Sequence, residues 1–278
     1  MNKYGLLGFP LGHTMSPPIH KRLFELEGVT DFDYSLFEIS EEDLDSRKDE
    51  LLSLRGFNIT IPHKGNIMKY LDELDSSAQR YSSVNCVVNR DGRHIGYNTD
   101  CDGFLRSCEA AGGSLSGSVL QCGCGGVGRM IAIECLRHGA DLTVSVMKGF
   151  EDTVEPVREY ARANGIDKPI NVVYPDTIEI KHYDTLINAT PVGMFPKTDA
   201  CPVSADIIKD TGFVFDVIYN PEETLLMKTA RENGIKAVGG MAMLVYQAVV
   251  AHEIWSGASY RTEDIDVLIS DMHALMRS

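Results

Sequence analysis

A glycine-rich run, Gly123-Cys124-Gly125-Gly126-Val127-Gly128, is the first pattern in this 278-residue chain that could do chemistry. The run Ser118-Val119-Leu120-Gln121-Cys122 before it indicates a strand, and the apolar spacing through Ile131 and Leu136 after it indicates a helix. The start of such a helix offers free N–H groups to a phosphate, and glycines let the ligand approach closely. A plain strand-to-helix turn is the alternative. We predict a dinucleotide-binding loop made of Gly123, Gly125, Gly126, Val127 and Gly128.

The end of the next predicted strand, residues 142–146, should lie near the adenosine ribose of a bound dinucleotide. Proteins that bind NAD usually place Asp or Glu there, whereas this chain has Met147-Lys148-Gly149. Because Lys148 could bind a 2′-phosphate, the sequence favours NADP as cofactor. A solvated loop lysine is the alternative, and Glu151 and Asp152 partly cancel its charge, so NAD stays open.

A lysine and an aspartate at the ends of two polar segments could form an acid–base pair. Residues 56–62 are an apolar strand stopped by proline, and Lys64 follows at its carboxyl end, where α/β proteins bind ligands. Asn98-Thr99-Asp100 supplies further polar groups at the junction of two α/β segments. An ammonium can stabilise charge on oxygen and transfer a proton while a carboxylate orients it. A surface lysine and an Asx-type helix cap are the alternatives.

Strand and helix patterns alternate along the chain, which is typical of an α/β protein. Asp91-Gly92 predicts a hairpin turn, and a helix is expected after Gly103. From residue 118 the alternation has the rhythm of a doubly wound sheet. The expected strands are residues 4–8, 32–38, 56–62, 118–122, 142–146, 170–173, 185–188 and 214–218.

We therefore predict an α/β fold with two domains. Residues 1–103 and 239–278 would form an N-terminal α/β catalytic domain, and residues 104–238 would form a Rossmann-type dinucleotide-binding domain. The long apolar helix 243–254 and the acidic helix 263–276 would return to the first domain.

Composition excludes several partners. A net charge of −14 would repel a polyphosphate backbone, so nucleic acid is not expected. The seven cysteines are odd in number and lack paired zinc spacing, which indicates a reducing compartment and no metal site. No apolar run is long enough to span a bilayer, so we expect a cytoplasmic protein without a membrane partner.

Six separated segments resemble the successive signature blocks of the shikimate dehydrogenase family, in order and across nearly the whole chain. They are Gly12-His13-Thr14-Met15-Ser16-Pro17, Asn58 to Lys64, Val84-Asn85, Asn98 to Gly103, Ile187 to Met194 and Gly239 to Gln247.

The resemblance implies reversible reduction of 3-dehydroshikimate to shikimate, usually by NADPH, in the biosynthesis of aromatic amino acids. Lys64 and Asp100 correspond to the catalytic pair. Hydroxyls can donate to the substrate carboxylate, and amides can serve the ring hydroxyls. The residues that would surround the substrate are Thr14, Ser16, Asn58, Thr60, Asn85, Tyr219 and Gln247. The predicted cofactor site also includes Thr190, Val217 and Gly240.

The sequence also departs from the family pattern. Thr14 replaces one of two usual serines, and Val146-Met147-Lys148 replaces an Asn-Arg-Thr signature for the 2′-phosphate. One alternative is therefore a quinate/shikimate or amino-shikimate-type dehydrogenase that uses NAD. A non-catalytic, ligand-sensing Rossmann protein is the alternative from another class. A monomer and a homodimer are both compatible with the sequence.

Overall fold

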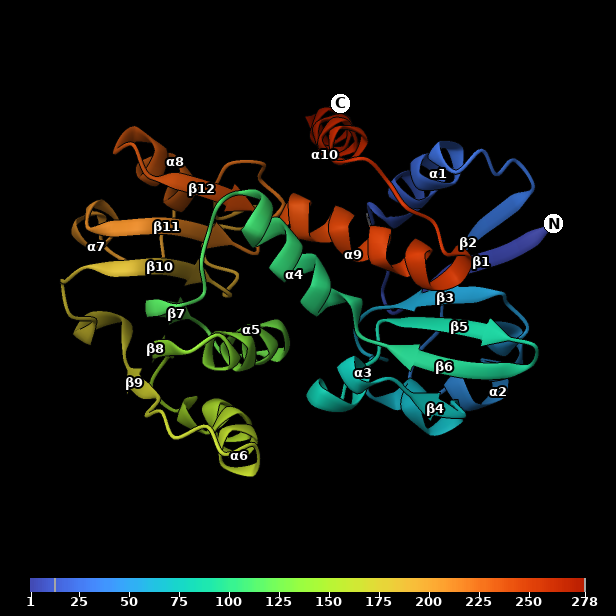
Figure 1. Ribbon diagram of the computed structural model, residues 1–278, viewed down its shortest axis with the longest axis horizontal. Helices are drawn as coiled ribbons and strands as arrows, with labels where there is room; N and C mark the ends of the chain where they lie inside the picture. Colours follow the sequence, from blue (N-terminus) through green and yellow to red (C-terminus); the bar gives the residue numbers. More distant parts are fainter. Residues whose placement is uncertain (13, 278) are drawn as a thin grey trace. The chain divides into compact units, whose positions relative to one another are not determined.

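The computed structural model describes residues 1–12 and 14–277, so His13 of the first signature block and the C-terminal Ser278 lie outside the described residues. The chain folds as two compact units (Figure 1). The first unit is Met1–Gly103 with Leu244–Ser278, and the second is Phe104–Met243. Each contains a six-stranded sheet and helices, which confirms the predicted α/β fold class. Within the described residues, no helix is long and apolar enough to cross a membrane.

The sheet of the first unit has the order β2-β1-β3-β5-β6-β4. β1 pairs in parallel with β2 and β3, whereas β5 runs antiparallel to β3 and forms a hairpin with β6. The hairpin turns at Asp91 and Gly92, both with positive φ, as this residue pair predicts. The strands are β1 (Asn2–Gly8), β2 (Phe32–Glu38), β3 (Gly56–Ile59), β4 (Glu73–Leu74), β5 (Cys86–Arg90) and β6 (Arg93–Tyr97).

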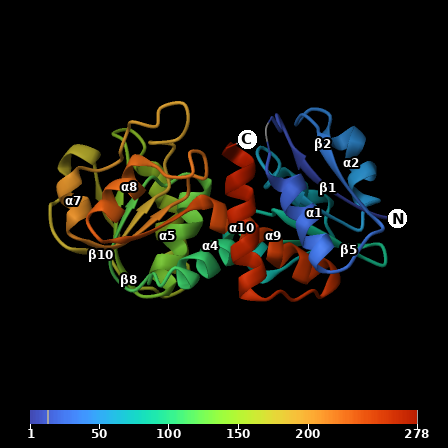
Figure 2. The same cartoon turned by 90° about the horizontal axis from the view of Figure 1, so that it is seen from above.

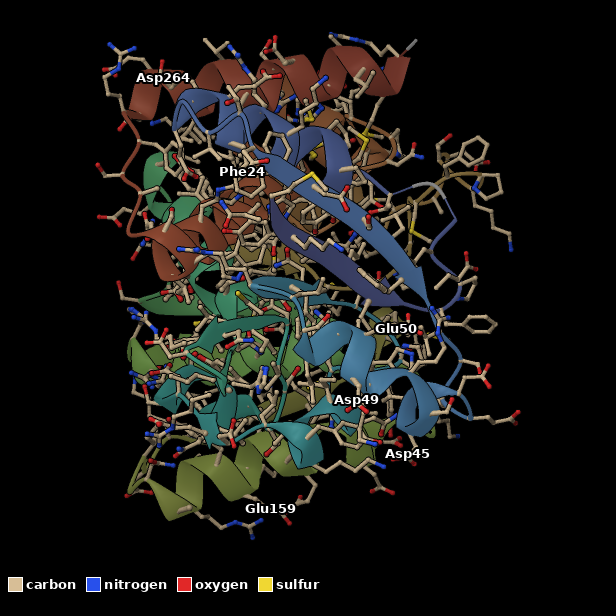
Figure 3. All side chains as sticks on the ribbon, turned by 90° about the vertical axis from the view of Figure 1, so that its right-hand side faces the viewer. Phe24, Asp45, Asp49, Glu50, Glu159 and Asp264 are labelled. Carbon is tan, nitrogen blue, oxygen red and sulfur yellow. The ribbon has the colours of Figure 1, made fainter. Side chains whose placement is uncertain are left out.

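Helices cover both faces of this sheet. Successive side chains of a strand point to opposite faces, and apolar side chains lie on both. On one face, Leu7 and Phe57 share a buried cluster with Leu51 of α2. On the other face, Tyr4 of β1 packs against Phe24 and Trp255. The outer side of α2 carries exposed carboxylates (Figure 3). The helices of this unit are α1 (Ser16–Leu26), α2 (Leu44–Leu52), η1 (Asn66–Tyr70), α3 (Ser76–Tyr81), most of α9 (Gly240–Ser256) and α10 (Thr262–Arg277).

The sheet of the second unit is entirely parallel, with the order β12-β11-β10-β7-β8-β9. Counted from β7, this is the 3-2-1-4-5-6 order of doubly wound dinucleotide-binding sheets, in which ligands bind where the order reverses. Here the reversal lies between β7 and β10. The strands are β7 (Gly117–Cys122), β8 (Ala140–Ser145), β9 (Asn171–Val173), β10 (Tyr183–Asn188), β11 (Thr211–Asp216) and β12 (Lys236–Gly239).

The helices of the second unit pack in pairs. α5 packs with α6 (Figure 1), and α7 packs with α8 (Figure 2). α4 begins at Thr99, so the expectation of a helix only after Gly103 was wrong. The reason is a side-chain cap at Asn98, which accepts a hydrogen bond from the Asp100 N–H at 3.2 Å. The helices are α4 (Thr99–Ala110), α5 (Gly126–Arg137), η2 (Glu151–Val154), α6 (Glu155–Ala163), η3 (Pro175–Thr177), α7 (Ala205–Lys209) and α8 (Leu225–Glu232).

Gly56 tests the packing of α9 on the first sheet. A Cβ at Gly56 would lie 2.4 Å from Trp255 Nε1, and that nitrogen donates to the Val87 carbonyl at 2.9 Å. Because the indole is held in place, Gly56→Ala should lower the free energy of unfolding by about 1–3 kcal/mol. Gly65→Ala, where a Cβ would meet nothing within 4 Å, is the control and should be close to neutral. Urea titrations would measure both, and equal stabilities would refute the packing described.

Candidate active site

The loop after β3 is anchored on both sides of Lys64. The buried His63 imidazole lies 2.6 Å from the Ile39 carbonyl through Nε2, and the Lys64 carbonyl accepts a hydrogen bond from Val84 N at 2.8 Å. These contacts tie the loop to two other segments of the first unit. The backbone of Lys64 is therefore fixed by contacts within the first unit.

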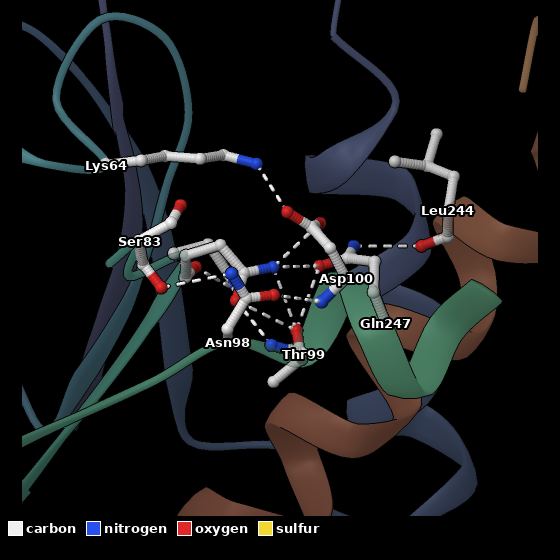
Figure 4. Close-up of polar contacts among 9 residues, drawn as sticks. Lys64, Ser83, Asn98, Thr99, Asp100, Leu244 and Gln247 are labelled. Carbon is white, nitrogen blue, oxygen red and sulfur yellow. Dashed lines mark hydrogen bonds and ion pairs between the residues drawn. The ribbon is translucent and has the colours of Figure 1, made fainter. Parts of the chain in front are cut away.

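Lys64 and Asp100 form an ion pair (Figure 4). Lys64 Nζ lies 2.5 Å from Asp100 Oδ2, and the two side chains are 25% and 16% exposed. Asp100 is in the first turn of α4, where Asn98 supplies the cap, so the Asx-cap interpretation of Asp100 was wrong. No other acceptor among residues 1–12 and 14–277 takes a hydrogen bond from the Lys64 ammonium. Its remaining N–H groups are available to a bound molecule.

The Asn85 amide orients the Lys64–Asp100 pair through a hydrogen bond to Asp100. Its Nδ2 donates to Asp100 Oδ1 at 2.9 Å and to Thr99 Oγ1 at 3.0 Å, and its Oδ1 accepts from Thr99 N at 2.6 Å. Gln247 on α9 joins through Oε1, which lies 3.4 Å from Thr99 Oγ1. Thr99, which is 1% exposed, was not assigned to the site from sequence. Its position next to Asp100 at a helix start was the available signal.

Tyr34 on β2 connects the residues predicted around the substrate carboxylate. Its hydroxyl donates to Asn58 Oδ1 at 3.0 Å and is hydrogen-bonded by the Ser16 side chain. Burial raises the pKa of Tyr34 well above its usual value, so the phenol stays protonated and can donate. Thr14 Oγ1 accepts from Ser16 N at 3.2 Å, which leaves its hydroxyl proton for a ligand. Sequence analysis missed Tyr34, because alternation along β2 indicates a face but no partner.

The remaining predicted substrate residues are placed less tightly. Thr60 follows β3 and is half-buried, with its methyl group against Gly8. Tyr219 is half-buried after β11 in the second unit. The first unit thus contains Lys64 and Asp100 together with Thr14, Ser16, Asn58, Thr60, Asn85 and Gln247.

The glycine loop between β7 and α5 contains two kinds of glycine. Gly123 has φ +88°, and a Cβ at Gly128 would lie 2.7 Å from the Gly123 carbonyl oxygen, so both positions require close backbone packing. A Cβ at Gly125 or Gly126 would instead meet no protein atom within 4 Å. These two glycines leave open space at the N-terminus of α5, where Val127 also lies. The loop therefore fits a pyrophosphate bound by N–H groups.

Asn188 gathers the other predicted cofactor residues at the ends of β10 and β11. Its Oδ1 accepts from Thr190 N and Oγ1 at 3.1 and 2.6 Å, and its carbonyl accepts from Val217 N at 3.0 Å. Its Nδ2 donates at 3.0 Å to Asp216, whose pKa burial raises to about 6. A Cβ at Gly240 would lie 2.0 Å from the Val217 carbonyl oxygen, so only glycine fits.

Lys148 is exposed in the turn after β8, as expected, but the turn also contains a carboxylate. Glu151 Oε2 accepts from Gly149 N at 2.9 Å, and Tyr174 OH donates to Glu151 Oε1 at 2.6 Å. The hydrogen bond from Tyr174 and those from the backbone lower the pKa of Glu151, so the carboxylate is ionised. Glu151, which the sequence analysis noted as partly cancelling the charge of Lys148, thus contacts the turn that contains Lys148 directly.

Known proteins resemble the chain over its whole length. The family model for the shikimate dehydrogenase substrate binding domain matches residues 6–87. A Methanococcus maripaludis protein named shikimate dehydrogenase (NADP(+)) is 40% identical over 258 residues, covering 91% of this chain and 90% of that protein.

Solved structures agree with this similarity. A chorismate mutase/shikimate 5-dehydrogenase fusion protein from Clostridium acetobutylicum has a TM-score of 0.89 and 32% identity, covering 100% of this chain and 99% of that one. The Thermus thermophilus shikimate 5-dehydrogenase in complex with NADP(H) and shikimate has a TM-score of 0.83 and 28% identity, covering 98% and 100%. The chain belongs to the shikimate dehydrogenase family.

Gly126 tests the cofactor loop, because a side chain there would fill space left open by the protein. Gly126→Val should leave the melting temperature of the ligand-free protein within a few degrees of wild type and weaken NADPH binding at least about tenfold. Calorimetric titration and thermal melting would measure the two effects. Unchanged NADPH affinity would show that the dinucleotide does not bind at this loop.

Proposed function

We propose that this protein catalyses the reversible, NADP-dependent reduction of 3-dehydroshikimate to shikimate. The observation that carries the proposal is the Lys64–Asp100 pair, 2.5 Å apart and oriented by the Asn85 amide. Family membership and the names of its relatives support the same reaction. A purely ligand-sensing role would not require a lysine with free N–H groups beside a carboxylate.

The chemistry follows from the charge that develops during reduction. Bound NADPH supplies the hydride, and negative charge then grows on the substrate oxygen. The Lys64 ammonium can stabilise this charge and donate its proton, while Asp100 holds the ammonium in place. In the reverse direction the neutral lysine accepts the proton. Asn85 acts on Asp100, so its amide contributes to the geometry of the pair.

Substrate recognition is proposed to use the polar groups of the first unit. The hydroxyls of Thr14 and Ser16 would donate to the substrate carboxylate. Asn85 and Gln247 would serve ring hydroxyls. The other residues of the first unit in the proposed substrate site are Asn58 and Thr60. Tyr219, which belongs to the second unit, stays a prediction from the family resemblance.

We assign cofactor binding to the second unit and substrate binding to the first unit with its C-terminal helices. The glycine loop fits the pyrophosphate, and Lys148 supplies a charge for the 2′-phosphate. The names of the relatives support NADP. No disulfide joins the seven cysteines within residues 1–12 and 14–277, which supports a cytoplasmic location, and the active form would be a monomer or a homodimer.

A dehydrogenase of the quinate/shikimate type that accepts NAD is the second candidate function. Glu151 favours it, because an ionised carboxylate in the Lys148 turn weakens attraction for a 2′-phosphate and could accept a hydrogen bond from a 2′-hydroxyl. Thr14, in place of the family's usual serine, would change how an additional substrate hydroxyl fits.

Replacing Lys64 tests the catalytic assignment. Lys64→Ala should lower kcat for shikimate oxidation by about 10²–10⁴-fold, because the charge that it stabilises appears during hydride transfer. Asp100→Asn should also slow turnover, since an amide cannot balance the ammonium charge. Glu109→Gln, on the exposed side of the same helix, is the matched control. Near-normal kcat in Lys64→Ala would contradict the assignment.

Replacing Glu151 tests cofactor selection. Glu151→Gln should raise the ratio of kcat/KM for NADP to that for NAD by about 3- to 10-fold, because it removes a negative charge from the Lys148 turn. Asp152→Asn, the neighbouring exposed carboxylate, should change the ratio less. If the two variants shift the ratio equally, the effect comes from net charge and not from the Glu151 contact.

A further inference from the structure

A hydrogen-bonded network with two buried histidines links α1, α9 and the segment before α10 in the first unit. Glu27 Oε1 contacts His252 Nδ1 and accepts from Tyr260 OH at 2.5 Å, and Glu27 Oε2 accepts from Ser256 Oγ at 3.0 Å. His252 Nε2 lies 2.9 Å from His20 Nδ1, and both imidazoles are 0% exposed. None of these groups is used by the hydride transfer proposed above.

The protonation states of Glu27, His252 and His20 determine which ring nitrogens carry protons. Burial opposes ionisation of Glu27, but hydrogen bonds from His252, Tyr260 and Ser256 outweigh it and lower the pKa of Glu27. Burial keeps the pKa of His252 below its usual value despite the carboxylate, and burial with the neighbouring His252 keeps the pKa of His20 well below its usual value. Near neutral pH the carboxylate is ionised and both imidazoles are neutral.

With Glu27 ionised and both imidazoles neutral, the hydrogen bonds between these three side chains can run in only one direction. An ionised Glu27 can only accept, so His252 carries its proton on Nδ1 and presents a bare Nε2. His20 must then donate from Nδ1, which leaves its Nε2 as a lone-pair acceptor. This buried Nε2 has no hydrogen-bond partner among residues 1–12 and 14–277. Such a tautomer persists because the chain to Glu27 holds it.

His20 lies against Tyr34, which contacts residues of the proposed substrate site. Its ring stacks on Tyr34 with centroids 4.4 Å apart and an interplanar angle of 14°. His20 also lies one helical turn after Ser16, on the same face of α1. Tyr34 in turn donates to Asn58 Oδ1, which directs the Asn58 amide nitrogen towards the Asn85 carbonyl oxygen at 3.4 Å.

We propose that the Glu27–His252–His20 chain positions the substrate site by fixing the ring plane of His20 and, through stacking, the direction of the Tyr34 hydroxyl. Tyr34 then sets the orientation of the Asn58 amide and the hydrogen bond of Ser16. Glu27, His252, His20 and Tyr34 are positioning residues. None of these four transfers a proton to substrate. The kinetic part of this inference rests on the proposed function.

Nuclear magnetic resonance tests the positioning without any turnover. Nitrogen-15 spectra of the wild type should show His20 and His252 protonated at Nδ1 and bare at Nε2. Flipping of the Tyr34 ring should be at least about tenfold faster in His252→Phe, which keeps an aromatic ring but breaks the chain. A proton on His20 Nε2, or an unchanged ring-flip rate, would overturn the proposal.

Kinetics test the consequence for substrate. His252→Phe should raise the KM for shikimate about 3- to 10-fold and change kcat and the KM for NADP by less than about twofold. Tyr34→Phe should give a similar change, and the double variant should be no worse than Tyr34→Phe alone, because both act through one hydroxyl. Additive effects would overturn the pathway through Tyr34.

The matched control is His94→Phe, a histidine of the same unit whose Nε2 lies 2.8 Å from the Leu52 carbonyl oxygen, outside the chain. It should leave the KM for shikimate unchanged, and thermal melting with NADPH titration would establish that every variant is folded. A wild-type protein that does not turn over shikimate would reject the proposed function. The tautomers and the ring-flip rate would then decide the positioning proposal alone.

Discussion

The Asn85 side chain is the constraint on which the active-site geometry depends. Its amide is 2% exposed, and it bonds Asp100 and Thr99 at the start of α4 while Gln247 of α9 closes the cluster. A buried amide left without partners would cost about 1–3 kcal/mol, so the first turn of α4 is held to one orientation. Asp100 then faces Lys64, and the ammonium is oriented before a substrate arrives.

The protein is acidic overall, whereas its proposed ligands are anions. A protein with net charge −14 that binds an anionic acid and a dinucleotide must attract them through local donors. We propose that in the first unit these donors are the ammonium of Lys64 and the hydroxyls of Thr14 and Ser16. In the second unit we propose the N–H groups at Gly125 and Gly126, where the protein leaves room for a ligand. Glu151 has the opposite effect, because its negative charge weakens the attraction of Lys148 for an anionic ligand.

Strand–helix alternation and the glycine run predicted the fold well, because both reflect local periodicity and backbone freedom. The meeting of Lys64 with Asp100, 36 residues apart, came from family resemblance, since spacing alone does not bring a loop and a helix start together. Tyr34 and Glu151 were missed for a related reason. Their roles depend on contacts with Asn58 and Gly149, which only the folded chain establishes.

The central claim is that Lys64, oriented by Asp100, acts on the reacting oxygen of a shikimate ring. A crystal structure of the protein with shikimate and NADP⁺ would test it most directly. The account predicts Lys64 Nζ within about 3 Å of the hydroxyl that is oxidised, with the Asp100 contact retained. A ring hydroxyl bound by other groups, with Lys64 turned to solvent, would contradict it.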